Sequence, residues 1–249
     1  LTAGTAFIMW LGEQITDRGI GNGISLIIFA GIVARVPSGL IRTVQQVIRN
    51  EMSVITLGLI LVMIFVVTAG TVMMQQAQRR IPVQYAKRVV GRRMMGGSST
   101  HVPIKINSAG VMPVIFASSI IMFPVTILKF LATPDRVVLQ WLFDNLQPGT
   151  ILYLTLYVAA IIFFTYFYTA IIFNPVDLAD NMKKYGGFIP GIRPGRNTAQ
   201  YIDRVLTRVT LVGAIFLSAI AVLPTLLYTQ LNVQFYFGGT ALLIVVGVG

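Results

Sequence analysis

The sequence predicts an all-α integral membrane protein, a polytopic bundle of transmembrane helices with one cytoplasmic loop that resembles a β-hairpin. Three observations support this fold class. First, 55% of the 249 residues are hydrophobic and only 11% are charged, whereas a soluble domain carries about a quarter charged residues. Second, the mean hydropathy is +0.79. Third, charge-free apolar windows recur along the chain at lengths that can cross a bilayer.

The apolar windows place the transmembrane helices, which need about 17–25 residues each. We expect five complete spans at residues 19–34, 53–74, 108–128, 151–173 and 209–228, with partial spans at 1–12 and 237–249. Prolines lie inside the third and fifth windows. Neighbouring helices must satisfy the carbonyls that these prolines free, so the helices are expected to pack in a bundle. Because the sequence begins and ends within apolar runs, we expect residues 1–249 to be a fragment of a single, longer transmembrane domain.

Basic residues are divided unevenly between the loops. Alternate loops, at 13–18, 75–107 and 174–208, hold 14 of the 19 Lys and Arg residues. Loops rich in Lys and Arg stay on the cytoplasmic side of a membrane. Loops 75–107 and 174–208 are therefore assigned to the cytoplasm. The net charge of +11 also predicts an anionic partner, such as lipid headgroups, nucleic acid or an acidic protein.

Loop 75–107 is predicted to form a long β-hairpin. Apolar side chains alternate with other residues in two stretches, 81–85 and 102–106, which is the period of a strand with one buried face. The tip between the two stretches carries four cations, Lys87, Arg88, Arg92 and Arg93. Two interpretations stay open. The cations either only fix topology and attract anionic lipid, at ~1 kcal/mol each near the surface, or the tip binds phosphate or acidic protein.

Loop 174–208 is predicted to form a helix, a turn and a second helix. Asn174 suits the N-cap of the first helix, and Gly186 or Gly187 suits the left-handed residue after its last turn. The segment FIPGIRPG cannot be helical, because each proline restricts the residue before it. Arg193 is thereby expected at the tip of a stiff turn. It is either a binding group that needs little ordering when a partner arrives, or a cation that only fixes topology.

Several classes of function are disfavoured by what the sequence lacks. No Asp, Glu, Lys, Arg or His lies inside the five complete windows, whereas an ion-coupled transporter needs such a group within the membrane. With no cysteine and one histidine, disulfides, thiolate metal sites and multi-histidine metal sites are excluded. The HExxH, GxSxG and P-loop motifs do not occur. We therefore expect neither an enzyme nor a resident cofactor.

Several long segments resemble the SecY family of bacterial protein-conducting channels. The resemblance covers nearly the whole chain, and these segments occur in the family's order: LTAGTAFIMWLGEQITDRGIGNGISLIIFAGIV, QYAKRVVGRRM, STHVPIKIN, AGVMPVIFASSI, FNPVDLADNMKKYGGFIPGIRPG and FYFGGTALLIVV. The resemblance implies ten transmembrane helices in two pseudo-symmetric halves, with this chain running from the end of the fourth helix into the tenth. It also implies a bacterial plasma-membrane location and a central pore-forming subunit, which passes unfolded polypeptides across the membrane or sideways into it.

The resemblance further implies roles for particular residues. The family's aliphatic pore ring corresponds to Ile24, Ile28, Ile115 and Ile244. The lateral gate corresponds to Ser118, Ser119, Phe123 and Thr165. Docking of the SecA motor or of the ribosome, through ribosomal RNA and exit-site proteins, corresponds to Lys87, Arg88, Arg92, Arg93 and Arg193.

The resemblance also implies partners: the SecE and SecG subunits, signal peptides, nascent chains and anionic lipids. From the residues alone, the four isoleucines are also what ordinary packing or lipid contact would use. Two other functions stay open at this point. One is a secondary solute transporter, which the charge-free spans disfavour. The other is a membrane anchor that binds ribosomes through RNA and needs no pore.

Overall fold

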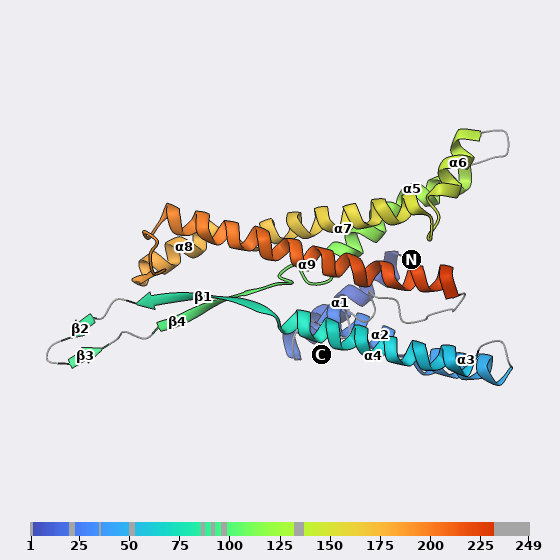
Figure 1. The fold of residues 1–249 in the computed structure, drawn as a ribbon, viewed down its shortest axis with the longest axis horizontal. Helices are drawn as coiled ribbons and strands as arrows, with labels where there is room; N and C mark the ends of the chain where they lie inside the picture. The colour runs from blue at the N-terminus through green and yellow to red at the C-terminus, as the bar shows by residue number, and fades with distance from the viewer. Residues whose placement is uncertain are drawn as a thin grey trace. The chain divides into compact units, whose positions relative to one another are not determined.

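The computed structural model describes residues 2–19, 23–34, 36–49, 53–85, 88–90, 93–95, 99–131 and 137–231 (Figure 1). These residues are mostly helical, with two small antiparallel sheets. The chain divides into two compact units, residues 1–73 with 220–249 and residues 74–219. Five described helical segments are long and apolar enough to cross a membrane: Gly23–Ile48, Val54–Gln76, Met112–Leu131, Ile151–Lys184 and Arg196–Leu226. Each of these segments overlaps one of the five expected spans, with different boundaries.

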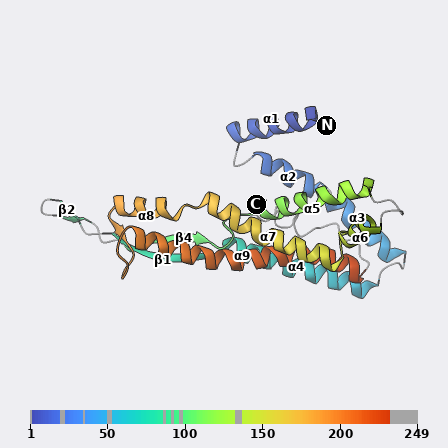
Figure 2. The same cartoon turned by 90° about the horizontal axis from the view of Figure 1, so that it is seen from above.

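The first unit begins with a packed helix pair. Its helices are α1 (Thr2–Arg18), α2 (Gly23–Val33), α3 (Val36–Ile48) and most of α4 (Val54–Gln76). α1 and α2 lie against each other (Figure 2), and the Gly23 amide donates to the Thr16 hydroxyl at 2.9 Å. Gly12 permits this approach, because a Cβ at that position would lie 2.8 Å from Ile24 Cγ1. Residues 13–18, expected in a loop, belong to α1.

α3 occupies a segment that we expected to be a loop, residues 35–52. α2 has 11 residues, so at about 1.5 Å per residue it is too short to cross about 30 Å of hydrocarbon. The expected span at 19–34 is therefore corrected: the candidate span continues through α3 to Ile48. Arg42 interrupts the charge-free window and so hid the helix, although Ile41, Val44 and Ile48 recur at helical spacing.

Three helices follow one another in the second unit: α5 (Met112–Leu131), α6 (Val137–Asn145) and α7 (Ile151–Ile172). α5 packs along α7, and the rings of Phe116 and Phe164 lie 5.8 Å apart between centroids. The Thr150 hydroxyl caps α7 by accepting the Tyr153 amide hydrogen at 3.3 Å. α6 lies within residues 129–150, which we expected to be a loop. Its 9 residues are too few for a membrane-length window, so the search for spans missed it.

The predicted hairpin is confirmed, and it is part of a larger sheet. β1 (Gln78–Tyr85) pairs antiparallel with β4 (Ser99–Lys105) in a register that places Ile81 opposite Val102. Nearer the tip, β2 (Arg88–Val90) pairs with β3 (Arg93–Met95). The short strand β5 (Gly187–Phe188) joins the other edge of β1, so the strand order is β4-β1-β5. β5 comes from loop 174–208, and we did not predict it.

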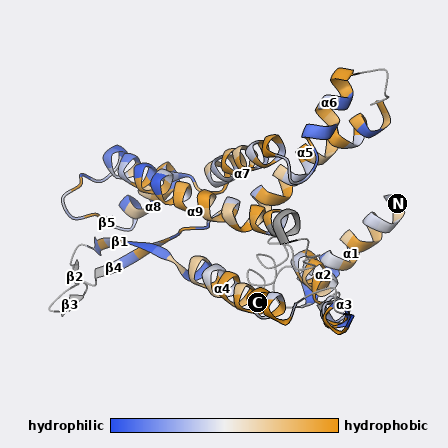
Figure 3. Ribbon diagram, turned by 45° about the vertical axis from the view of Figure 1, so that its right-hand side comes forward, coloured by the Kyte–Doolittle hydropathy of each residue, from blue (hydrophilic) through white to orange (hydrophobic). Residues whose placement is uncertain are grey.

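The helix, turn and helix predicted for loop 174–208 are also confirmed. α8 (Pro175–Lys184) begins after Asn174, whose side chain accepts the Val176 amide hydrogen at 3.1 Å and donates to Asp177 at 2.8 Å. Gly186 follows the helix with φ +71°. The second helix, α9 (Arg196–Leu231), is continuous over 36 residues. The expected span at 209–228 is therefore the apolar part of a longer helix whose first turns are hydrophilic (Figure 3).

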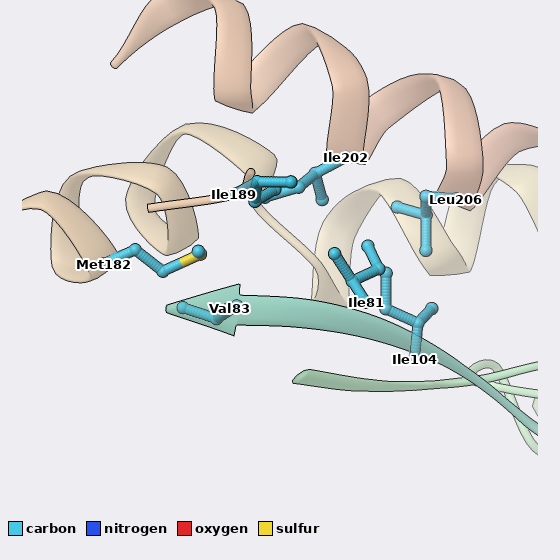
Figure 4. Close-up of a cluster of buried hydrophobic side chains, with 7 residues drawn as sticks. All are labelled: Ile81, Val83, Ile104, Met182, Ile189, Ile202 and Leu206. Carbon is cyan, nitrogen blue, oxygen red and sulfur yellow. The ribbon is translucent and has the colours of Figure 1, made fainter. Parts of the chain in front are cut away.

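An apolar cluster joins the two basic loops, and we call it the cytoplasmic core. Figure 4 shows its side chains, which come from β1, β4, α8, the turn after α8, and α9: Ile81, Val83, Ile104, Met182, Ile189, Ile202 and Leu206. All seven are no more than 7% exposed. This packing explains why apolar side chains alternate along the hairpin. One face of β1 and β4 is buried against α8 and α9, and every second side chain of a strand points to that face. The two loops, far apart in sequence, form one folded body.

The base of the hairpin and α9 approach closely next to this core. The Ile106 amide donates to the Ala77 carbonyl oxygen at 3.0 Å and closes the hairpin. Gly213 of α9 faces the same point, where a Cβ would lie 2.7 Å from the Ile106 carbonyl oxygen. Only a residue without a side chain allows the helix to approach the backbone this closely.

Ile202→Ala is predicted to loosen the cytoplasmic core, because Ile202 is 1% exposed. Truncating a buried isoleucine costs about 2–4 kcal/mol through lost burial and the cavity left behind. We expect faster trypsin cleavage at residues 193–196 in the full-length protein, in vesicles whose cytoplasmic face is outward. Val176→Ala is the control, since Val176 is 56% exposed on α8. Equal cleavage rates for the two variants would contradict the assignment of the core.

Candidate functional site

Arg193 lies in a turn whose preceding backbone is fixed. The Ile192 amide donates to the Ile189 carbonyl oxygen at 3.1 Å, across Pro190 and Gly191. Gly191 has φ +81°, as the third residue of a type II turn requires, and a proline suits the second residue. Ile189 is 4% exposed and belongs to the cytoplasmic core. The turn is thus anchored by a buried side chain next to its exposed tip.

The backbone after Arg193 is fixed by the start of α9. The Thr198 hydroxyl donates to the Arg193 carbonyl oxygen at 3.0 Å, and Thr198 is only 2% exposed. The Ala199 amide donates to the Gly195 carbonyl oxygen at 3.1 Å and begins the helix. Arg193 itself is exposed. The expected stiff turn is confirmed, and it presents one guanidinium group to solvent. That this group docks a partner stays a prediction.

The hairpin tip is described only in part. Arg88 and Arg93 lie in β2 and β3, where Arg88 is opposite Met95 and Arg93 is opposite Val90. Lys87 and Arg92 lie outside the described residues. Both arginines lie in this second, two-stranded sheet, which falls between β1 and β4 in the chain. Their role in docking stays a prediction.

The four isoleucines of the predicted pore ring fall on different parts of the chain. Ile24 and Ile28 are one turn apart on α2 and are 47% and 42% exposed. Ile115 is on α5 in the second unit and is 37% exposed. Ile244 lies outside the described residues. All three described side chains are more than a third exposed, and that they line a channel stays a prediction.

The predicted gate residues differ in their surroundings. Ile115, Ser119 and Phe123 follow one another at helical spacing on an exposed face of α5. The Ser118 and Ser119 hydroxyls both donate to the Ile115 carbonyl oxygen, at 2.9 and 2.8 Å, which satisfies them within the helix. Such serines add little polarity to an apolar surface.

Thr165 is the exception among the gate residues, because it is buried within α7 at 3% exposure and donates to the Ile161 carbonyl oxygen at 2.6 Å. It continues a buried stripe with Tyr157 and Thr169 at four-residue spacing. A change at Thr165 would therefore act through helix packing.

The arginines among these residues are suited to binding anionic groups. A guanidinium group offers a planar set of donors that matches phosphate and carboxylate alike. Among the described residues there is no cluster of three or more His, Cys, Asp or Glu side chains that could hold a metal ion.

Two features of this region were missed by reasoning from the sequence. One is β5, whose two residues are too short to show any periodicity. The other is a polar hollow between α7 and α9, lined among others by Thr169, Asp203 and Thr210. These residues are far apart in sequence and share no motif. The one available signal was the spacing of Asp203, Thr207 and Thr210, which places them on one face of a helix.

Comparison with known proteins shows close similarity along the whole chain. A family model described as SecY matches residues 1–249. Proteins named protein translocase subunit SecY are 54% identical in Vibrio cholerae, 53% in Escherichia coli and 52% in Haemophilus influenzae. Each of these alignments covers 99% of this chain and 56% of the relative. The chain therefore spans about half the length of the curated relatives it matches.

Two solved structures share the fold. One is described as the structure of a protein conducting channel; it has a TM-score of 0.65 and 17% sequence identity, and the match covers 100% of this chain and 61% of that chain. The other concerns the plug domain of the SecY protein; it has a TM-score of 0.65 and 18% identity, and the match covers 62% of that chain. At these identities the likeness concerns the fold alone.

Thr198→Val is predicted to loosen the turn that carries Arg193. The substitution keeps the shape of the buried side chain and removes its hydrogen bond, worth about 1 kcal/mol. Hydrogen exchange at the Ile192 amide should then be about fivefold faster, since the local opening free energy falls by that amount. Thr207→Val is the control, because Thr207 loses a similar bond, to the Asp203 carbonyl oxygen, away from the turn. An unchanged exchange rate in Thr198→Val would show that the bond does not hold the turn.

Proposed function

The chain belongs to the SecY family, and on that premise we propose that it is part of the central pore-forming subunit of a protein-conducting channel in the bacterial plasma membrane. The channel passes unfolded polypeptides across the membrane or sideways into it. The observation that carries this proposal is the family match over residues 1–249, together with 52–54% identity to proteins named protein translocase subunit SecY. Long apolar helices and a basic folded body built from the two loops of the second unit are consistent with it.

A ring formed by Ile24, Ile28, Ile115 and Ile244 is the proposed constriction. An apolar collar blocks ions by excluding water, and it makes no specific bond to the chain that passes. The exposure of the three described members supports this role. Ser118, Ser119 and Phe123 on α5, with the buried Thr165 on α7, are the proposed gate residues. α5 and α7 pack against each other, so one helix pair carries all four residues and would form one side of the gate.

The cytoplasmic body is the proposed docking surface. Arg193 would bind the SecA motor, and the tip cations Lys87, Arg88, Arg92 and Arg93 would bind SecA or the ribosome, through its RNA and its exit-site proteins. The fixed turn at Arg193 supports this, because little conformational freedom is lost when a partner binds. Arginine's affinity for both phosphate and carboxylate allows one surface to serve both partners.

The remaining partners are proposed on the same basis: the SecE and SecG subunits, signal peptides, nascent chains and anionic lipids. The family is one of translocase channels, not of classical enzymes. We propose no catalysis by this chain, so the energy would come from ATP hydrolysis by SecA, from the ribosome or from the proton-motive force. A secondary solute transporter is not favoured by these comparisons.

Arg193→Glu in the full-length protein is predicted to abolish SecA-driven secretion while leaving the protein inserted. The substitution reverses an exposed charge and removes no buried group. Translocation of a model secretory protein into vesicles would measure the effect, and trypsin resistance of the cytoplasmic body would check folding. Arg196→Glu is the matched control, since Arg196 is also exposed but lies in the first turn of α9. Normal secretion by Arg193→Glu would refute the docking role.

The double change Ile28→Asn and Ile115→Asn is predicted to raise ion leak through the full-length channel. Polar side chains at the constriction hold water where an apolar collar excludes it. Ion flux across vesicles containing the variant measures the leak, with Ile28→Leu and Ile115→Leu as the apolar control. If leak and secretion both stay at the wild-type level, the ring is not the constriction, and a ribosome-binding anchor becomes the better account.

A further inference from the structure

We propose that the hollow between the C-terminal end of α7 and the charged N-terminal part of α9 binds the headgroup of an aminophospholipid such as phosphatidylethanolamine. The hollow has a volume of about 130 Å³, and its polar lining comes from Tyr166 and Thr169 of α7 and from Asp203, Thr207 and Thr210 of α9. A second, more open hollow along α9 shares Asp203 and Thr207 and adds Gln200, Arg204 and Arg208. The two hollows thus adjoin the same two residues of α9.

The site carries charges of both signs that are not paired with each other. Arg204 and Arg208 are one helical turn apart and exposed, and Asp203 is exposed beside them. Within residues 137–231, which the structure describes without a gap, none of the three forms a salt bridge. Two arginines side by side match one phosphate group, and a carboxylate matches an ammonium group. A ligand that carries both groups would satisfy all three side chains.

Two threonines of the inner hollow, Thr169 and Thr210, are each only 4% exposed. Other helical threonines of the second unit donate to the carbonyl four residues earlier, as Thr165 does to Ile161 at 2.6 Å. The Thr169 and Thr210 hydroxyls have no such partner in the part of the chain that the structure describes, and neither is among its buried unsatisfied atoms. Their hydroxyl oxygens are therefore open to the hollow, where they can bind polar atoms of a ligand.

The position along the helices fits a lipid. α7 ends at Ile172, and the charge-free run of α9 begins at Val209, directly after Arg208. The site therefore lies where the chain passes from water into hydrocarbon, at the depth of the headgroups. Beyond Arg208, the same face of α9 exposes Leu211 and Ile215, at 44% and 56%. One face thus offers arginines for a phosphate and, further along, an apolar surface for an acyl chain.

The two charge signs distinguish between lipid classes. Phosphatidylethanolamine offers a phosphate to the arginines and an N–H donor to Asp203. Phosphatidylglycerol offers the phosphate but no cation, and it leaves the carboxylate unpaired. Phosphatidylcholine carries a quaternary ammonium group, which cannot donate a hydrogen bond. The Thr207 hydroxyl donates to the main-chain carbonyl oxygen of Asp203 at 2.9 Å, and the exposed Asp203 carboxylate forms no salt bridge among residues 137–231.

Photo-labelling in nanodiscs tests the proposal directly. The full-length protein is placed in phosphatidylcholine discs that contain a trace of photoactivatable phosphatidylethanolamine, phosphatidylglycerol or phosphatidylcholine with identical acyl chains. Label on the peptide spanning residues 197–215 is measured by mass spectrometry. We expect phosphatidylethanolamine to label this peptide most strongly. Lipid labelling does not depend on secretion. It therefore tests the lipid site even if the proposed channel function is wrong.

Substitutions test which side chains bind the phosphate and which binds the ammonium group. The double change Arg204→Gln and Arg208→Gln should lower labelling by phosphatidylethanolamine at least fivefold, from about 1 kcal/mol for each cation near the membrane surface. Asp203→Asn should remove the preference for phosphatidylethanolamine over phosphatidylglycerol. Lys183→Gln with Lys184→Gln is the control, since it removes two exposed charges of α8 that do not line the site. All of these side chains are exposed, so the fold should be kept.

Three results would overturn the proposal. Equal labelling by the three lipids would show a bulk lipid contact. Stronger labelling by phosphatidylglycerol, unaffected by Asp203→Asn, would show a simple anion site. Labelling that is unchanged in the double arginine variant would show that the phosphate does not bind between Arg204 and Arg208.

Discussion

Burial of the cytoplasmic core is the interaction on which the charged part of this protein depends. The membrane excludes charge from the spans, so nearly all polar chemistry is confined to loops, and loops by themselves are mobile. Here, Val83 and Ile104 of the hairpin are buried against Ile202 of α9, and each such side chain stabilises the assembly by about 1.5–3 kcal/mol. The core therefore turns two loops into one rigid support, from which the turn at Arg193 and the hairpin tip project.

The continuity of α9 gives this support a direct connection to the membrane. The helix starts one turn beyond the Arg193 turn, to which Thr198 is hydrogen-bonded, and continues without a break to Leu231. It passes the base of the hairpin at Gly213, where only a glycine fits. A partner that displaces the Arg193 turn must consequently act on the whole helix, because no flexible linker separates the exposed tip from the apolar part. A docking surface that works through a channel needs such a connection.

The sequence was sufficient where the structure depends on local pattern. Five spans, the hairpin, the capped helix after Asn174 and the stiff turn all follow from hydropathy, alternation and Pro/Gly placement. It was insufficient where the pattern was short or broken: Arg42 concealed α3, and α6 and β5 are too brief to give a period. Contacts between segments far apart in the chain could not be predicted from the sequence. The alternation of Ile81 and Val83 indicates a buried face, but nothing in it indicates that α9 covers that face.

The same limit explains why cations that are alike in the sequence differ in function. Arg193, Arg204 and Arg208 all contribute to the positive-inside signal, which counts charge and ignores height above the membrane. Along α9, however, the twelve residues from Arg196 to Arg208 rise by about 18 Å, which is about two Debye lengths at physiological salt. Arg208 adjoins the apolar run and lies within reach of headgroups, whereas the field of the lipid surface is largely screened at Arg193. The helix therefore divides one basic loop into arginines at the depth of the proposed lipid site and an arginine at the height proposed for a soluble partner.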